Sequence, residues 1–414
     1  MINSSDALRI ILENVHPIGT EKLLLAKSLA RTFARDIVAH EDLPPFDNSS
    51  MDGFALSSSD LNGASGDHPC VLRIIGESSA GNAFSGRIKA GQSVRVMTGG
   101  VLPRGADSVV PIEDAIEMDG ETVRFSQSAS PGRFVRKSGE DIKRGEVILK
   151  EGTAITPPSL GVLAALGRER VRVYKKPCVN IVATGNELVD LLAKPGKGKI
   201  RNSTSYGLAG YVVEAGGMPE LMGIAGDREK ALRKRLSDGL KADVLLVTGG
   251  VSVGKYDLVQ ETLSALGVEV KFWKVNIKPG RPFLFGVRKS TLVFGLPGNP
   301  VSTYVTFLQF VRPALLAMTG IREIQPLRLT AVLDQEFSKS DGKRHFVRGI
   351  AVRRSGELHV TTTGTQSSGA MSSMSRANCL MIIPEDSTNL HRGDSVDIEL
   401  LPHCGYIPDS VKNT

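Results

Sequence analysis

An anion-binding turn is predicted over residues 244–257, which read VLLVTGGVSVGKYD. The first four residues are apolar and do not alternate with polar ones, which is typical of a parallel strand buried on both faces. The strand pattern breaks into a turn that holds three glycines, Gly249, Gly250 and Gly254. Glycine permits positive φ angles and a close approach of backbone N–H groups to a ligand. A helical pattern follows from Tyr256, so the helix N-terminus would add unpaired N–H groups and its dipole.

The same stretch resembles a Walker A phosphate loop, but it departs at one position. Gly249, four intervening residues and Gly254-Lys255 fit the pattern, whereas Tyr256 replaces the Ser or Thr that would bind Mg²⁺. This substitution argues against an ordinary P-loop NTPase. Asp257, on the first turn of the predicted helix, suits the helix dipole and could hold a cation. A tight strand-to-helix turn without a ligand remains an alternative for this stretch considered alone.

A second candidate binding stretch lies at residues 46–54, which read FDNSSMDGF and are rich in polar side chains. Two carboxylates, including Asp52, lie with an amide and two hydroxyls between aromatic residues, as in a binding loop. A plain turn into a strand fits the composition equally well. Thr98, in the turn MTGG at residues 97–100, has the same two interpretations, an anion contact or a hairpin turn.

Composition narrows the class of protein. The chain has 414 residues, more than one core normally holds, so several domains are expected. It is 41% hydrophobic and 23% charged, as in soluble globular proteins, and no apolar run reaches the ~20 residues of a membrane span. The N-terminal 15 residues fit an amphipathic helix and not a signal peptide. The four cysteines form no CxxC pair, and the seven histidines lack metal-ligand spacing, which indicates a reducing cytoplasm and argues against zinc.

The net charge of +7 favours anionic partners only mildly. No Lys/Arg stripe interleaved with aromatic residues is present, and only 5% of residues are aromatic. These features argue against nucleic-acid binding, which uses basic stripes and stacking platforms.

Several types of element must position these residues. Residues 4–39 are predicted to be helical, with a second helix over residues 23–33, and Pro44-Pro45 marks a boundary. Short strands and frequent glycines over residues 54–137 predict an inserted β domain. A helix over residues 157–166 is expected to pack with the N-terminal helices, which would make the first domain discontinuous.

From residue 177 strands and helices alternate, which predicts a doubly wound α/β sheet. Ligands of such sheets bind outside the carboxyl ends of the strands. Several polar groups follow predicted strands there, namely Glu187, Asp227, Asp257 and the turn at residues 296–302. Lys274 and Lys278 follow the strand at residues 268–273 and suit a phosphate or oxyanion, although either alone fits a solvated surface lysine.

After Pro326 the alternation stops, and strands predict a small C-terminal β domain. The loop at residues 363–369, TGTQSSG, is either flexible or an oxyanion contact. The predicted domains are residues 1–40 plus 138–176 (discontinuous, helical and linker), 41–137 (inserted β), 177–325 (α/β) and 326–414 (C-terminal β).

Seven motifs in order along the chain resemble the MoeA and gephyrin E-domain family, the molybdopterin molybdenumtransferases. They lie at residues 44–53, 97–99, 139–141, 184–188, 248–254, 277–282 and 295–302. The resemblance covers nearly the whole chain. It implies an elongated four-domain homodimer, multidomain α/β and β, whose third domain is the molybdopterin-binding α/β fold. Two positions depart from the family pattern: Lys255, where many relatives have an acidic or small residue, and Ser367, where glycine is common.

The resemblance implies a cytoplasmic enzyme that inserts molybdate into adenylylated molybdopterin and releases AMP, with Mg²⁺ as the cation. It assigns catalytic roles to Asp52, Thr98, Asp141 and Glu187, and Mg²⁺ binding to Asp227 and Asp257. It assigns substrate contacts to Thr184, Gly249, Gly250, Ser252, Gly254, Lys274, Lys278, Pro297, Pro300, Arg348 and Ser368.

Partners implied by the family, besides a second copy of the chain, are the molybdopterin adenylyltransferase and proteins that mature molybdoenzymes. Two alternatives stay open. One is a pterin-binding scaffold without catalysis, and the other is a paralogue that inserts tungsten, because tungstate and molybdate have nearly the same size and charge.

Overall fold

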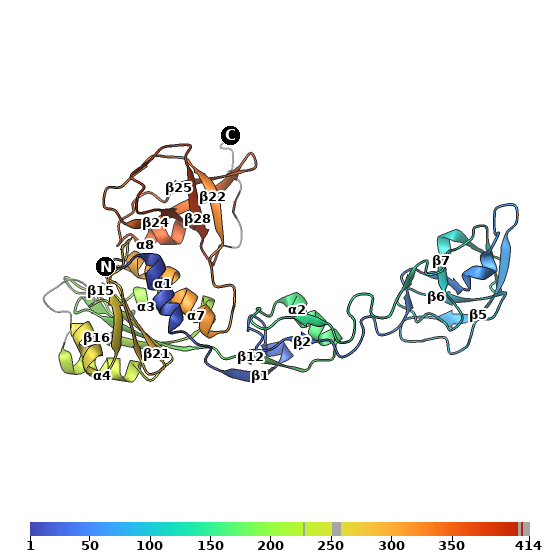
Figure 1. Cartoon of the computed structure of the whole chain (residues 1–414), viewed down its shortest axis with the longest axis horizontal. Helices are drawn as coiled ribbons and strands as arrows, with labels where there is room; N and C mark the ends of the chain where they lie inside the picture. The colour runs from blue at the N-terminus through green and yellow to red at the C-terminus, as the bar shows by residue number, and fades with distance from the viewer. Residues whose placement is uncertain (227, 251–257, 405–406, 409–414) are drawn as a thin grey trace.

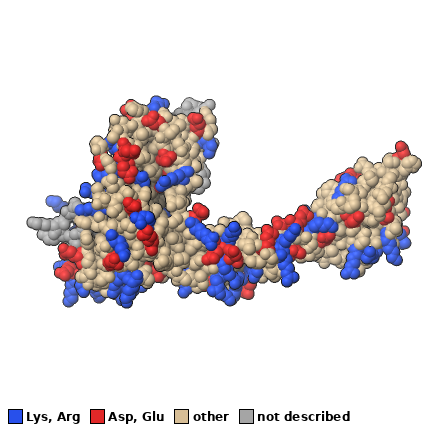
Figure 2. Space-filling view, in the orientation of Figure 1, with Lys and Arg blue, Asp and Glu red and all other residues tan. Residues whose placement is uncertain are grey.

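The computed structural model describes residues 1–226, 228–250, 258–404 and 407–408 of the chain. The molecule is elongated (Figure 1). An α/β body and a C-terminal barrel lie together at one end, and a narrow arm leads to a separate β domain at the other end. Lys, Arg, Asp and Glu side chains are interspersed along the visible face of the arm (Figure 2).

The α/β body is built on a six-stranded sheet of order β16-β13-β17-β21-β20-β18. Its strands are β13 (Cys178–Thr184), β16 (Met218–Ala225), β17 (Val244–Thr248), β18 (Glu269–Trp273), β20 (Leu284–Arg288) and β21 (Thr291–Leu296). The first four strands in the spatial order are parallel, while β20 is antiparallel to both of its neighbours. All five residues of β17 are buried, as expected for a central parallel strand. The predicted doubly wound sheet is therefore confirmed.

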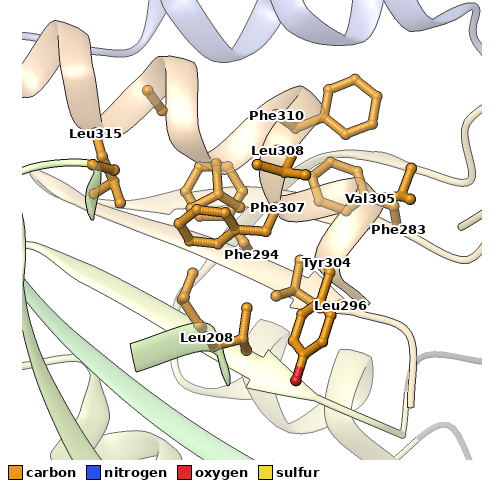
Figure 3. Close-up of a cluster of buried hydrophobic side chains, with 14 of the residues drawn as sticks. Leu208, Phe283, Phe294, Leu296, Tyr304, Val305, Phe307, Leu308, Phe310 and Leu315 are labelled. Atoms are coloured by element: carbon orange, nitrogen blue, oxygen red, sulfur yellow. The ribbon is translucent and has the colours of Figure 1, made fainter. Parts of the chain in front are cut away.

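Helices cover both faces of this sheet, and each face has its own apolar core. Leu208 of α3 (Thr204–Glu214) and Phe307 of the long helix over residues 300–318 pack on one face with Phe294 of β21 (Figure 3). Leu236 of α4 (Glu229–Gly239) and Leu263 of α5 (Leu258–Ala265) pack on the other. These opposed cores fix the carboxyl ends of the central strands at one edge.

The long apolar helix runs from Pro300 to Met318 and contains α6 (Pro300–Thr306), a π turn (Phe307–Val311) and α7 (Arg312–Met318). Pro313 lies two residues after the π turn, and a proline in a helix removes a backbone donor, so a local change of hydrogen-bond register is expected in the preceding turn. The helix is long and apolar enough to cross a membrane, yet 83% of its most apolar window is buried inside the protein. Its packing on the sheet accounts for its hydrophobicity (Figure 3).

The N-terminal region differs from the prediction. Helix α1 (Ser4–Glu13) is present, but the predicted helix over residues 23–33 is wrong, because β1 (Thr20–Leu24) and a short 3₁₀ turn (Leu25–Lys27) occupy its first part. Strand β1 pairs antiparallel with β12 (Arg170–Tyr174), whose Val171 and Val173 are buried. Pairing with a distant strand has overridden local helix propensity here.

Helices α1 and α2 do not pack together as expected. Ala7 and Ile11 of α1 are buried in the core of the α/β body, beside α7. Leu163 of α2 (Pro157–Ala165) is buried instead with Phe33 and Val171. The predicted domain boundaries remain a prediction, but the first helix belongs by packing to the α/β core.

The inserted β domain has a sheet of order β7-β4-β6-β5-β9-β8, so the predicted β structure of this region is confirmed. Its strands are β4 (Gly53–Leu56), β5 (Cys70–Ser78), β6 (Gln92–Val96), β7 (Ser108–Pro111), β8 (Ala115–Glu117) and β9 (Thr122–Phe125). The chain enters and leaves it through paired strands. These are β3 (Asn48–Ser49) with β10 (Val135–Arg136), and β2 (Ile37–Val38) with β11 (Val147–Leu149).

The C-terminal domain is a small barrel, since β24 pairs with both β25 and β26 and so closes the sheet. Its strands are β22 (Arg328–Leu333), β24 (Arg344–Arg354), β25 (Glu357–Thr362), β26 (Cys379–Ile383) and β28 (Ser395–Leu400). Strand β19 (Ile277–Lys278) of the α/β body pairs with the start of β24 and ties the two units together. Helix α8 (Met371–Arg376) was not predicted. Shorter strands are β14 (Leu188–Val189), β15 (Ile200–Arg201), β23 (Phe337–Ser338) and β27 (Asn389–Leu390).

Candidate active site

A cavity of about 830 Å³ lies outside the carboxyl ends of β13, β17 and β21. Three turns line it, each following one of these strands, and helices α4 and α5 contribute Leu232 and Leu258. Six residues predicted as site residues line the cavity, namely Thr184, Glu187, Gly249, Gly250, Pro297 and Pro300. The sheet topology therefore brings together residues that are more than 100 positions apart in the chain.

The turn after β17 requires glycine. Gly249 and Gly250 have φ angles of 83° and 65°, in the left-handed region. A Cβ atom on Gly249 would lie 2.5 Å from the carbonyl oxygen of Thr184, and one on Gly250 would lie 2.5 Å from Cγ2 of Val259. The backbone of this turn therefore runs directly against its neighbours and forms part of the cavity wall.

Hydrogen bonds lock the three strand ends together. The Thr184 hydroxyl donates to the Thr248 carbonyl over 3.1 Å, which joins β13 to β17. The Gly249 N–H donates to the Leu296 carbonyl over 3.1 Å, which joins β17 to β21. The cavity wall is consequently fixed by backbone and buried side-chain bonds within the chain.

The turn after β21 is held by the first residues of α6 and by the barrel. The Thr303 hydroxyl donates to the carbonyl oxygens of Pro297 and Asn299. The Asn299 side-chain amide donates to the Ser368 hydroxyl over 3.0 Å, and the Val301 N–H donates to the Ser368 carbonyl over 3.2 Å. The predicted loop around Ser368 is thereby attached to the first turn of α6.

A second cavity, of about 560 Å³, lies between the α/β body and the barrel. It shares Pro282 and Ser302 with the first cavity, so the two adjoin. Its lining includes the cations Lys278, Arg281, Lys343 and Arg348, and the hydroxyls Ser302, Ser338, Ser367 and Ser368. Cationic and hydroxyl donors of this kind suit an oxyanion.

Arg348 is buried in the wall of this second cavity, with 1% of its surface exposed. Its Nε donates to the Ser373 hydroxyl over 3.1 Å, and its Nη2 donates to the Ser367 carbonyl over 3.0 Å. Burial lowers the pKa of Arg348 to about 10, which still leaves it charged at neutral pH. The guanidinium therefore holds the serine loop in place and adds positive charge to the cavity.

Lys278 and Lys274 differ in position. Lys278 lines the second cavity and forms an ion pair with Asp341 at 3.2 Å. Lys274 does not line either cavity, and its Nζ lies 3.6 Å from the centroid of the Trp273 ring. Of the two lysines that the sequence pattern paired, the structure places only Lys278 in the site.

Asp52 and Thr98 lie together, but away from both cavities of their own chain. The Thr98 N–H and hydroxyl both donate to Oδ1 of Asp52, each over 2.7 Å. These two bonds lower the pKa of Asp52 below its usual value, and the bond from the Thr98 backbone N–H has the larger effect. The carboxylate is therefore ionised at neutral pH, and its Oδ2 accepts no bond from the described residues.

The other proposed catalytic carboxylate of the arm, Asp141, is exposed, and its N–H donates to the Leu43 carbonyl over 3.0 Å. Figure 1 shows β6, which Thr98 follows, at the opposite end of the molecule from β21. None of Asp52, Thr98 and Asp141 lines either cavity of the chain.

Four predicted site residues, Ser252, Gly254, Asp227 and Asp257, lie outside the described residues, as does Lys255. Within the described part of the chain, no group of three or more His, Cys, Asp or Glu side chains could hold a metal ion. The proposed Mg²⁺ ligands thus stay a prediction.

Sequence patterns missed two residues that line the second cavity and a carboxylate that contacts them. Lys343 and His345 line it, and Asp341 contacts both of them. Lys343 precedes β24 directly and His345 is its second residue, and only the pairing of β24 with β19 brings them beside Lys278. The sequence around them reads as an ordinary strand start and gives no local signal of a site.

Comparison with known proteins covers the chain almost end to end. Three family models match it in order: the MoeA N-terminal region (domain I and II) over residues 2–167, a probable molybdopterin binding domain over residues 180–317, and the MoeA C-terminal region (domain IV) over residues 330–401.

Similar whole proteins carry the same name. A molybdopterin molybdenumtransferase of Haemophilus influenzae is 34% identical over 390 residues, which is 94% of this chain and 95% of that protein. One of Bacillus subtilis is 35% identical over 386 residues, which is 92% of this chain and 90% of that protein.

Solved structures agree with this relationship. The crystal structure of a molybdopterin biosynthesis MoeA protein from Pyrococcus horikoshii OT3 superposes with a TM-score of 0.84 at 31% identity. The superposition covers 97% of this chain and 100% of the Pyrococcus chain. With the motifs, the fold and the full-length relatives in agreement, the chain belongs to the MoeA family of molybdopterin molybdenumtransferases.

Proposed function

We propose that this protein is a Mg²⁺-dependent molybdopterin molybdenumtransferase that converts adenylylated molybdopterin and molybdate to molybdenum cofactor and AMP. The observation that carries the proposal is the pair of adjoining cavities. One is walled by glycine and backbone groups at strand ends, and the other by cations and serines, and they share Pro282 and Ser302. A phosphorylated pterin and an oxyanion could thus be held side by side.

In this proposal the first cavity receives the pterin and its pyrophosphate. The Gly249 N–H is bonded to the Leu296 carbonyl, so the backbone at Gly250 would approach the ligand, as glycine allows. Glu187, Pro297 and Pro300 complete the wall. Asp227 and Asp257 would hold Mg²⁺, since carboxylate oxygens are ligands that Mg²⁺ prefers, and the cation would neutralise charge on the phosphoanhydride.

The second cavity receives molybdate. Lys278 reaches it from β19, Arg348 and Ser368 from the barrel, and these donors match the charge of a tetrahedral dianion. Holding the oxyanion next to the pterin would convert the transfer into a reaction between neighbouring groups, which is a large source of rate. A water oxygen attacks the phosphoanhydride and AMP leaves. The pterin's two sulfur atoms then bond to the molybdenum of molybdate, and one of its oxygens leaves as water with their protons.

We further propose that the enzyme is a cytoplasmic homodimer in which Asp52, Thr98 and Asp141 of one chain complete the cavity of the other. The separation of the arm from the cavities within one chain supports this arrangement (Figure 1). A two-fold axis would make two equivalent composite sites. The ionised Asp52 would then contribute a carboxylate to the phosphoanhydride end of the site.

The proposed reaction is tested by single turnover with adenylylated molybdopterin, in the presence of molybdate, of tungstate or of neither. Release of AMP that depends on molybdate is the expected result. Dependence on tungstate instead would identify a tungsten enzyme. Binding of the nucleotide without AMP release in any condition would leave a pterin-binding scaffold and contradict the proposal.

A further inference from the structure

Asp341 lies behind the wall of the second cavity and contacts three of the residues that line it. Its Oδ1 accepts a hydrogen bond from His345 Nε2 at 2.8 Å, and its Oδ2 lies 3.2 Å from Lys278 Nζ and 3.4 Å from Lys343 Nζ. Asp341 itself is not part of the lining. One carboxylate therefore holds two of the cations that face the cavity.

The loop that carries Asp341 is held in place by several bonds. Lys339, which is 8% exposed, donates from Nζ to the carbonyls of Lys343 over 2.6 Å and Glu385 over 3.0 Å. The Asn276 side chain donates to the Gly342 carbonyl over 3.0 Å, and Lys278 pairs with His345 in the strand register. These bonds fix the position of the Asp341 carboxylate relative to β19 and β24.

The charges of this cluster do not cancel. Burial lowers the pKa of His345, so its ring is neutral near pH 7 and donates its Nε2–H to Asp341. Burial alone would raise the pKa of Asp341, but the hydrogen bonds from His345 and Lys278 outweigh it and hold that pKa well below the usual range. An ionised Asp341 therefore offsets one of the two positive charges of Lys278 and Lys343.

We propose that Asp341 is a built-in counter-anion that weakens the second cavity for tetrahedral dianions and so limits its occupation by sulfate and phosphate. The proposal rests on the proposed function for the identity of the productive dianion as molybdate. The competing explanation is an ion pair that only fixes the loop to β19. When the charge alone is removed, the counter-anion explanation predicts tighter dianion binding. The loop-fixing explanation predicts unchanged or weaker binding.

Asp341→Asn separates them. Asparagine keeps one acceptor oxygen, which can serve His345 or the lysines but not both, and it loses the negative charge. Positioning by a partly exposed ion pair contributes little, whereas repulsion between a carboxylate and a dianion a few ångströms apart is substantial. Removing the charge is therefore expected to tighten dianion binding.

Isothermal titration of the full-length protein with molybdate, and separately with sulfate, measures the effect. We expect Asp341→Asn to lower Kd about fivefold for both ions, which corresponds to about 1 kcal/mol. Lys278→Ala should raise Kd for both. Asp341→Ala, which loses the acceptor too, should still lower Kd, by less.

The matched control is Asp334→Asn in the same barrel. Asp334 accepts a bond from His359 at 2.9 Å and pairs with Arg354 at 2.7 Å, but it contacts none of the second cavity's lining. Its replacement should leave Kd unchanged. Unchanged or weaker binding in a folded Asp341→Asn protein would overturn the counter-anion role and leave a loop-fixing pair.

Single turnover distinguishes this inference from the proposed function. AMP release by the wild type, without tighter dianion binding in Asp341→Asn, removes only the inference. Tighter dianion binding in Asp341→Asn, without AMP release by the wild type, removes only the proposed reaction. Absence of dianion binding in both proteins at millimolar concentration contradicts both.

Discussion

At the scale of single residues, the turn after β17 is constrained most tightly. The positive φ of Gly249 and the 2.5 Å approach that its Cβ would make to the Thr184 carbonyl leave no room for a side chain. The backbone geometry of this turn therefore requires glycine in the wall of the first cavity. Because the same backbone would face the ligand, a side chain at Gly249 would disturb ligand binding as well as the fold.

Gly249→Ala is expected to slow AMP release sharply and to lower the thermal unfolding midpoint, because the left-handed backbone alone costs about 1–3 kcal/mol. The matched control is Gly161→Ala in α2, where an added Cβ meets nothing within 4 Å. There alanine should stabilise the helix by about 0.5–1 kcal/mol and leave the rate unchanged. Equal rates in both variants would exclude a role for this turn in the site.

The proposed Mg²⁺ ligands give a second prediction for single residues. Asp227→Asn and Asp257→Asn should each raise the Mg²⁺ concentration needed for half-maximal AMP release, about tenfold or more if one charged ligand is worth roughly 1.5 kcal/mol or above. Asp243→Asn is the control, because Asp243 accepts from the Cys178 N–H at the opposite end of the sheet. If Asp227→Asn and Asp257→Asn need the same Mg²⁺ concentration as the wild type and the Asp243→Asn control, the assigned metal ligands are wrong.

At the scale of elements, the chain's patterns predicted the α/β sheet and the position of Glu187 and the turn at residues 296–302 at strand ends, while Asp227 and Asp257 lie outside the described residues. Buried parallel strands have continuous apolar runs, and glycine turns after them are local signals that survive in the sequence. The helix predicted over residues 23–33 failed because β1 is stabilised by β12, about 150 residues away. Lys343 and His345 were missed for the same reason, since their relation to Lys278 arises only from the β19–β24 pairing.

The junction between α6 and the barrel loop is another long-range feature and gives a prediction. Asn299→Ala removes the bond to the Ser368 hydroxyl, and hydrogen exchange of the amides at residues 363–369 should become faster. The thermal midpoint should change little, because one exposed hydrogen bond contributes about 1 kcal/mol. Asn389→Ala, at an exposed site where no side-chain hydrogen bond is seen within the described chain, should leave this exchange unaltered.

Slower or unchanged exchange of that loop in Asn299→Ala would contradict the view that α6 holds it. A faster loop together with a raised KM for molybdate would link the junction to the second cavity. Because Asn299 also lines the first cavity, the KM for adenylylated molybdopterin is measured alongside, and a change in it would report on that cavity and not on the loop.

At the scale of the whole molecule, the arm separates groups that the proposed chemistry needs together. The inserted β domain and the α/β body occupy opposite ends of the chain (Figure 1). No local pattern could reveal this separation, because it depends on the paired strands that carry the chain out along the arm and back. The account therefore depends on a second copy of the chain to bring Asp52 to the cavities.

The most direct test of this central claim uses two inactive homodimers, Asp52→Ala and Asp257→Ala, with different tags. Co-expression and double-tag purification isolate the heterodimer, and AMP release is then measured with molybdate. If sites form between chains, one site collects both defects and the other has none, so activity should recover to roughly half of wild type. A wild-type dimer carrying both tags must remain fully active. A heterodimer as inactive as its parents would contradict the shared site.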